Sequence, residues 1–335
     1  MSSSAPPRAI DVSASEADLV HLLDRRLIFV TGKGGVGKTS IAAAIADIAV
    51  RDGARVLLVE MDAKGALSTA VETGPLTFEA REVRSGLWAM AMNTEDALRE
   101  YLRLFVRVPL LGRIGPLART FDFLADAAPG VKEILAIGKI CYEVKERNYD
   151  LVVVDTEATG HIVAQIGAPS VIREMIQMGL VRDQTQWMLD VLNDPAITAV
   201  AAVTTPEEMP VVETLELITA LGERTGVEVS TVVANRVLPA IFDRARLGVF
   251  ERLGEADDLL RTAAGPSASV VIEAVGAAEA RRRVGAEHLE ALRAGLPASI
   301  ETIYAPELMT RATGRRVVAL LADALAAELD RGGSA

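Results

Sequence analysis

A glycine-rich run at residues 32–40 has the residue types and spacing needed to hold the phosphates of a nucleotide. It satisfies the pattern Gly-x-x-x-x-Gly-Lys-Thr, with an apolar run before it and a candidate helix after it. Glycines let backbone N–H groups turn toward phosphate oxygens without a Cβ clash, and the start of a helix adds positive potential. The expected nucleotide-binding residues are Gly32, Lys33, Gly34, Gly35, Val36, Gly37, Lys38, Thr39 and Ser40.

Three side chains of this run are expected to act on a triphosphate. Lys38 places a positive charge at the β- and γ-phosphates, and the Thr39 hydroxyl ligates Mg²⁺, so ATP and Mg²⁺ are the expected cofactors. Lys33 lies between two glycines and has no evident packing role. We expect it to reach a phosphate bound by a partner subunit, as an arginine finger does; a solvated lysine is the alternative.

Aspartates that follow two apolar runs complete the expected site. Asp155 closes the run 151–154, and a carboxylate at the end of a buried strand can hold Mg²⁺ through water. Asp62 comes shortly after the run 56–59, next to the expected phosphate site. The expected metal site therefore consists of Thr39, Asp62 and Asp155.

The elements that must position these residues alternate between strand and helix. Short apolar runs predict buried strands at 27–30, 56–59, 87–92, 151–155, 197–203, 228–234 and 299–304. Helices are expected at 38–51, 94–146, 161–192, 207–224, 240–296 and 311–330, after a short helix that begins near Ser15. The alternation predicts an α/β fold, a P-loop NTPase with a doubly wound, mostly parallel sheet.

Two helical stretches interrupt this strand–helix core, at approximately 94–148 and 161–192. Each follows the carboxyl end of a strand, where open α/β sheets bind their ligands, so we expect a helical subdomain above the nucleotide. Residues 15–335 are expected to form a single P-loop ATPase domain. Residues 1–14 are expected to be a disordered tail, because the chain begins with a Ser-, Ala- and Pro-rich stretch that has no apolar signal core.

Composition narrows the classes of function. The formal net charge of −11 disfavours general binding to nucleic acid or to anionic lipid, both of which need a basic surface. No apolar run reaches the ~18 residues that a membrane-spanning helix requires. The protein is therefore expected to be cytoplasmic, with no nucleic-acid partner and no stable membrane insertion.

Together these motifs resemble the deviant Walker A ATPases, which include nitrogenase iron protein and the chromosome-partitioning ATPases. The resemblance is closest to the branch of the arsenical pump ATPase and the ATPase that targets tail-anchored membrane proteins, and it covers residues 25–330. Four further segments carry it. They are 56–63, similar to an apolar strand with x-x-Asp-Pro-Ala; 127–133, similar to Ala-Pro-Gly-x-x-Glu; 155–161, similar to Asp-Thr-Ala-Pro-Thr-Gly-His; and 232–235, a strand that ends in asparagine.

The resemblance implies roles for individual residues. Asp62 would position or activate the attacking water and Lys33 would act across a dimer, so these two are the expected catalytic residues. Asn235 would read the adenine edge, because its amide both donates and accepts hydrogen bonds. The alternatives are a loop or helix-capping aspartate for Asp62 and a turn asparagine for Asn235. His161 remains open between a γ-phosphate sensor and a helix-start residue.

The chain departs from the family pattern at three positions that bear on hydrolysis. Ala63 stands where proline is usual, and Glu157 and Ala158 stand where Ala-Pro is usual. Nucleotide binding is still expected, whereas the rate of hydrolysis and its coupling are left open.

Cysteine usage separates the chain from several members of that family. Its one cysteine, Cys141, cannot form an internal disulfide, a thiolate site for a metalloid, a Cys-x-x-Cys zinc pair or an iron–sulfur ligand set. A small buried residue is the expected role of Cys141. No metal beyond Mg²⁺ is implied.

The resulting hypothesis is a Mg²⁺-dependent ATPase that forms a homodimer or pairs with a related ATPase. Its nucleotide state would open and close the helical inserts around an apolar helical client. The expected client surface consists of Leu102, Phe105, Val106, Leu110, Leu111, Val171, Met175, Met178, Trp187 and Met188; helical core is the alternative role for these residues. Two other hypotheses are a nucleotide-binding scaffold with weak or no turnover and a surface-partitioning ATPase.

Overall fold

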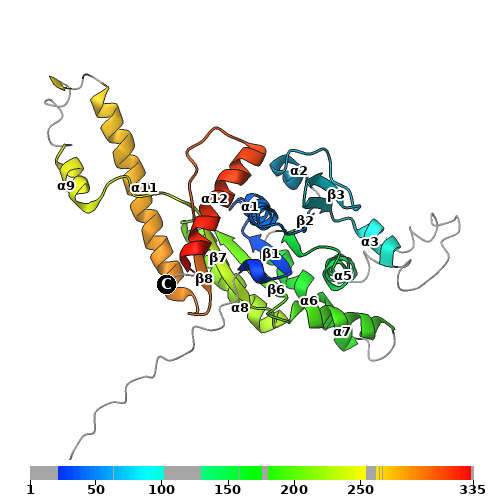
Figure 1. The fold of residues 1–335 in the computed structure, drawn as a ribbon. Coiled ribbons are helices and arrows are strands. Elements are labelled where there is room, and N and C mark those ends of the chain that lie inside the picture. The colour runs from blue at the N-terminus through cyan, green and yellow to red at the C-terminus, as the bar shows by residue number, and fades with distance from the viewer. Residues whose placement is uncertain are drawn as a thin grey trace, which may run out of the picture.

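The computed structural model describes residues 22–62, 64–101, 130–157, 159–175, 180–253, 262–263, 265 and 267–332. Within these residues one eight-stranded sheet is covered by helices on both faces (Figure 1). The strands are β1 Leu27–Gly32, β2 Val56–Glu60, β3 Arg81–Arg84, β4 Leu87–Ala91, β5 Leu151–Asp155, β6 Thr198–Thr204, β7 Val229–Val237 and β8 Glu301–Pro306. The helices are α1 Lys38–Arg51, α2 Ala66–Ala70, α3 Thr94–Tyr101, α5 Val131–Lys145, α6 Thr159–Met175, α7 Leu180–Leu192, α8 Glu208–Thr225, α9 Arg244–Leu253, α11 Ala268–Gly295 and α12 Gly314–Gly332.

The order of the strands places β1 at the centre of the sheet. The order is β3-β4-β2-β5-β1-β6-β7-β8, and every neighbouring pair is parallel except β3 with β4. Asp155 pairs with Val30 of β1 on one side and with Glu60 of β2 on the other. Because these strands are parallel and in register, the residues that follow them gather at one edge of the sheet.

Alternate residues of the central strands fill two separate cores. In β1, Leu27 and Phe29 pack into the core under α5, α6 and α8, whereas Ile28 and Val30 pack into the core under α1 and α12. Figure 1 shows these two helical layers on opposite sides of the sheet. A strand that is buried on both faces needs apolar residues at every position, which is why these runs carry no polar alternation.

The predicted fold class is confirmed, and so are the seven predicted strands, with shifts of a few residues at their ends. The eighth strand, β3, was missed because Arg81, Glu82 and Arg84 give no apolar signal; pairing with β4 makes it a strand. The predicted helical stretch at 94–146 contains α3 and α5, and the stretch at 240–296 contains α9 and α11. Of the helix expected near Ser15, only a 3₁₀ turn at Leu22–Asp24 falls within the described residues.

Cys141 lies in α5 and is fully buried, as predicted for a small core residue. Burial raises the pKa of its thiol well above the ordinary value, which keeps the side chain neutral. Among the helices described here, none has both the length and the apolar character that crossing a bilayer requires.

Gly32, the last residue of β1, provides a test of this packing. A Cβ atom there would lie 2.2 Å from the carbonyl oxygen of Val203 in β6, and φ is +148°. We therefore expect Gly32→Ala to lower the free energy of unfolding by about 2–4 kcal/mol. Urea denaturation without nucleotide measures the loss. Gly34→Ala is the matched control, since its Cβ would meet nothing within 4 Å; equal effects of the two changes would contradict the packing argument.

Candidate nucleotide-binding site

The phosphate loop joins the central strand β1 to α1 and adopts a conformation that favours glycine. Gly35 and Gly37 have φ angles of +88° and +97°, in the left-handed region where a side chain is strained. Gly37 directly precedes α1, so the loop leads into the positive end of a 14-residue helix. This geometry suits the cradle of backbone N–H groups that the sequence predicts.

Lys38 lies over the loop. Its Nζ donates a hydrogen bond to the carbonyl oxygen of Lys33 at 3.1 Å, which folds the side chain back across the loop. Burial lowers the pKa of Lys38, and the nearby Asp155 carboxylate acts in the opposite direction. A desolvated ammonium group in this place attracts a phosphate more strongly than a solvated one would.

Thr39 and Asp155, two of the predicted metal ligands, are brought together by α1 and β5. The Thr39 hydroxyl donates a hydrogen bond to Asp155 Oδ2 at 2.6 Å. The other carboxylate oxygen, Oδ1, is buried and has no hydrogen-bond partner among the described residues. A hydroxyl next to a carboxylate with a spare oxygen fits Mg²⁺, which takes oxygen ligands and keeps several waters.

The environment of Asp155 strongly disfavours its charge. Burial raises the pKa of this carboxyl to about 6, the Thr39 hydrogen bond and Lys38 partly offset that rise, and Glu60 and Asp62 add to it. Three carboxylates therefore share this edge of the sheet. A divalent cation would relieve their mutual repulsion.

Asp62, the third predicted ligand, lies at the rim of this cluster. It is partly exposed and forms an ion pair with the exposed side chain of Lys64. Glu60, in contrast, is buried, and its Oε1 accepts a hydrogen bond from the Leu67 backbone N–H at 3.2 Å. Sequence reasoning gave Glu60 no role; an acid at the end of an otherwise apolar strand is the signal that was available.

Lys33 forms an ion pair with a residue of the same chain. Its Nζ lies 2.6 Å from Glu213 Oε1 of α8, and both side chains are about one-third exposed, at 31% and 28%. Sequence reasoning missed Glu213, because an acid on a helix 180 positions away gives no local signal. The contact gives Lys33 a definite partner in place of a fully solvated position.

Asn235 braces the phosphate loop from β7. Its side chain is buried, and Nδ2 donates a hydrogen bond to the Val36 carbonyl oxygen at 2.8 Å. Oδ1 accepts from the Arg236 backbone N–H at 2.9 Å, where Arg236 has a φ of +59°. A Cβ atom at Gly37 would lie 2.4 Å from Nδ2. Contact with adenine stays a prediction beside this bracing contact.

The segment after β5 contains one of the departures from the family pattern. Glu157 Oε2 lies 3.4 Å from Nδ1 of His161, an exposed residue in the first turn of α6. Thr156 is anchored to β1, because its hydroxyl donates to the Val30 carbonyl oxygen at 3.0 Å. Ala63 and Ala158, the other two departures, lie outside the described residues, and Ser40 lies partly buried in the first turn of α1.

With this geometry in view, comparison with known proteins identifies the family. A sequence profile described as Anion-transporting ATPase matches residues 25–186 and 173–247, more than half of the chain. The chain belongs to the anion-transporting ATPase family. The predicted family is thereby confirmed, and similar proteins named as ATPases occur in bacteria, archaea and eukaryotes.

Three relatives illustrate how far the similarity extends. ATPase BagA of Mycobacterium tuberculosis is 33% identical over 226 residues, which cover 64% of this chain and 66% of that protein. A putative arsenical pump-driving ATPase of Halobacterium salinarum is 29% identical over 276 residues, 74% of this chain and 42% of that protein. ATPase get3 of Schizosaccharomyces japonicus is 32% identical over 161 residues, 48% of each chain. The chain thus spans just under two thirds of the mycobacterial relative and less than half of the other two.

The raised pKa of Asp155 predicts how Mg²⁺ binding depends on pH. Because the pKa lies near 6 and not near 3.8, the metal-free carboxyl is protonated below pH 6, and Mg²⁺ requires the ionised form. We expect the Mg²⁺-dependent part of ADP affinity to fall about tenfold for each pH unit below that value. Calorimetric titration from pH 7.5 down to about pH 5 measures it.

Asp155→Asn, titrated over the same range, is the control, because it reports protonation of the nucleotide alone. Identical pH profiles for the variant and the wild type would exclude Asp155 from the metal site.

Proposed function

We propose that this protein is a Mg²⁺-dependent ATP hydrolase whose nucleotide state drives a conformational change in a dimer. The observation that carries the proposal is the contact of the Thr39 hydroxyl with Asp155 beside a glycine loop that leads into α1. A hydroxyl, a buried carboxylate and an ammonium group at one strand edge are the groups that bind Mg²⁺ and a triphosphate together. Membership of a family of ATPases supports the same activity.

In this proposal each side chain has a distinct task. The loop amides and Lys38 bind the β- and γ-phosphates, while Thr39 and Asp155 hold Mg²⁺ directly or through water. Asp62 orients the attacking water, since its carboxylate is partly exposed near the cluster and its ion pair within the described residues is with the exposed Lys64. Asn235 keeps the loop in its binding conformation and presents its amide toward the base.

Dimerisation would complete the site through Lys33. To reach a phosphate in the partner subunit, Lys33 must leave Glu213, and this exchange of one anion for another links nucleotide binding to α8. An ion pair between partly exposed groups stabilises by only about 0–1 kcal/mol, so a triphosphate competes for Lys33 easily. Homodimer and pair with a related ATPase both remain open.

The described residues of the predicted client surface fall into two groups, one packed in the core and one exposed. Met188 is buried and Trp187 packs against the same core, so for these two residues the core alternative holds. Val171 and Met175 on α6 are exposed, at 54% and 74%, and they support an apolar helical client. The remaining predicted residues lie outside the described part of the chain. They are Leu102, Phe105, Val106, Leu110, Leu111 and Met178.

A surface-partitioning ATPase is the less favoured hypothesis. Such an enzyme would use a basic or amphipathic C-terminal helix to reach a membrane or DNA. Here the apolar face of α12 is buried against α1 through Val318, Leu321 and Leu325. The next measurement distinguishes the hypothesis of an active ATPase from that of a nucleotide-binding scaffold with little turnover.

Asp62→Asn is expected to reduce steady-state ATP hydrolysis about 10²-fold or more while ADP affinity changes little, because the amide cannot act as a base toward water. Phosphate release under saturating Mg·ATP provides the readout. Asp52→Asn, at the exposed end of α1, is the control for loss of one charge. A wild type with no turnover would favour the scaffold, and full activity in Asp62→Asn would remove Asp62 from the mechanism.

Mixing two inactive variants tests the action of Lys33 across the dimer. In a mixed dimer of Lys33→Ala and Asp62→Asn, the Lys33→Ala subunit keeps an intact Asp62 and receives Lys33 from its partner. We therefore expect activity to reappear on mixing, up to about one quarter of the wild-type rate for random pairing with one working site per mixed dimer. Mixtures that stay inactive, although the variants are shown to exchange subunits, would mean that Lys33 acts within its own site.

A further inference from the structure

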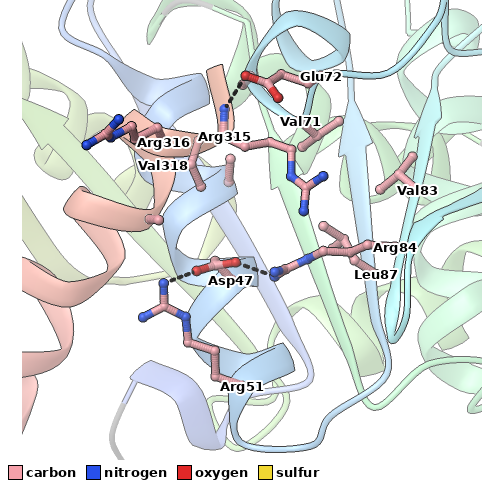
Figure 2. A pocket seen from close by; sticks show the side chains of 13 residues that line it. Asp47, Arg51, Val71, Glu72, Val83, Arg84, Leu87, Arg315, Arg316 and Val318 are labelled. Carbon is pink, nitrogen blue, oxygen red and sulfur yellow. Dashed lines mark hydrogen bonds and ion pairs between the residues drawn. The ribbon is translucent and has the colours of Figure 1, made fainter. Parts of the chain in front are cut away.

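A second cavity lies away from the phosphate loop, between α1, α12 and the edge strands of the sheet (Figure 2). Its volume is about 400 Å³. None of the residues that line the cavity belongs to the phosphate loop. They come from the middle and end of α1, the end of α2 and the two residues after it, β3, β4 and the start of α12. The lining consists of Ala43, Asp47, Arg51, Ala70, Val71, Glu72, Val83, Arg84, Leu87, Arg315, Arg316, Val318 and Ala319.

The lining is rich in arginine although the whole protein carries a net charge of −11. Four arginines and two carboxylates contribute to it. Asp47 is buried and is shared by two of the arginines, since Arg51 contacts its Oδ2 at 2.6 Å and Arg84 contacts its Oδ1. One carboxylate therefore orients two guanidinium groups, and Arg51 has a second partner outside the lining, Asp323 Oδ1 of α12, at 2.5 Å.

Arg315 supplies a guanidinium group with no ion pair among the described residues. Figure 2 shows it extending from the start of α12 toward Arg84, whereas Arg316 points away from the cavity. The backbone, not the side chain, of Arg315 makes the local contact, because its N–H donates to Glu72 Oε1 at 3.2 Å. The second carboxylate of the lining is thus engaged with backbone and does not neutralise this arginine.

The wall that holds Arg315 is built with conformational strain. Glu72 adopts a φ of +53°, unusual for a residue with a side chain. Gly314 has a φ of +56°, and a Cβ atom there would lie 2.2 Å from Glu72 Oε1. The strained pair fixes the start of α12 against the segment after α2, which keeps Arg315 at the mouth of the cavity.

We infer that this cavity binds a small organic phosphate with an apolar body. Guanidinium groups from Arg84 and Arg315 offer planar pairs of N–H donors that fit phosphate oxygens. Asp47 and Asp323 already balance Arg51 and Arg84, so Arg315 supplies the positive charge that no ion pair among the described residues neutralises. Val71, Val83 and Leu87 add apolar wall for the organic part, and the volume limits the ligand to a small molecule.

Binding of phenyl phosphate to the full-length protein tests the inference, with calorimetry as the readout. Lys38→Ala is used as the background so that capture of phosphate by the loop is weakened. In that background we expect Arg315→Gln to weaken phenyl phosphate binding about tenfold or more, as for the loss of a charge-assisted hydrogen bond. Arg311→Gln, which removes an equal charge just outside the lining, should leave the affinity unchanged.

Benzoate and inorganic phosphate separate the parts of the inference. Benzoate has the apolar body with a single charge, and inorganic phosphate has the charge without the body; both are expected to bind more weakly than phenyl phosphate. Benzoate binding as tightly would overturn the phosphate assignment. Inorganic phosphate binding as tightly would overturn the assignment of an apolar subsite.

Two further outcomes would overturn the site itself. One is phenyl phosphate binding that disappears in Lys38→Ala, which would place it on the phosphate loop. The other is phenyl phosphate binding that is absent, or that has the same affinity in Arg315→Gln and Arg311→Gln.

Arg84→Lys is the second variant. It keeps a positive charge beside Asp47 but removes the planar guanidinium group with its paired N–H donors, so it should still weaken binding. Circular dichroism of each variant confirms folding.

Discussion

The hydrogen bond between Thr39 and Asp155 is the contact on which the candidate site depends. It joins the first turn of α1 to the end of β5, two elements far apart in sequence. The register of β1 with β5 makes the contact, since Val30 lies opposite Asp155 and the phosphate loop begins two residues later. Any slip of that register would turn Asp155 to the other face of the sheet.

The same edge concentrates charged groups, of which Glu60 and Asp155 are buried. Lys38 and Asp155 are both shifted toward their neutral forms by burial, while Glu60 is fully enclosed between neighbouring strands. Lys38 donates to the Lys33 carbonyl oxygen and Asp155 accepts from Thr39, but one oxygen of Asp155 has no hydrogen-bond partner among the described residues. Mg²⁺ and a polyphosphate would supply the missing counter-charges. Ligand binding would thereby offset the unfavourable free energy of burying these charged groups.

Two regions connect this edge to the rest of the molecule. On one face of the sheet, Glu213 of α8 forms an ion pair with Lys33. The same helix packs against α6, which carries the exposed residues Val171 and Met175. On the other face, α2 follows Asp62 and continues into Glu72, which anchors the start of α12. The proposed client surface is therefore linked to Lys33 through α8. The arginine-lined cavity is linked to Asp62 through α2.

Sequence alone determined the phosphate loop, the α/β class and seven of the strands, because each is written in local patterns. Glycine spacing specifies backbone angles, and unbroken apolar runs specify strands that are buried on both faces. Local pattern also indicated Asp62, Asp155 and Asn235, which lie at or shortly after the ends of such runs.

Tertiary structure alone decided which groups meet. The pairing of Lys33 with Glu213, the bracing of Val36 by Asn235 and the burial of Met188 all depend on contacts between distant segments. The strand β3 exists only because its polar residues pair with β4, and the arginines around Asp47 come together only when α1, β3 and α12 pack. Charges and hydrogen-bond donors reach their partners through space, so their spacing along the chain carries no information about these contacts.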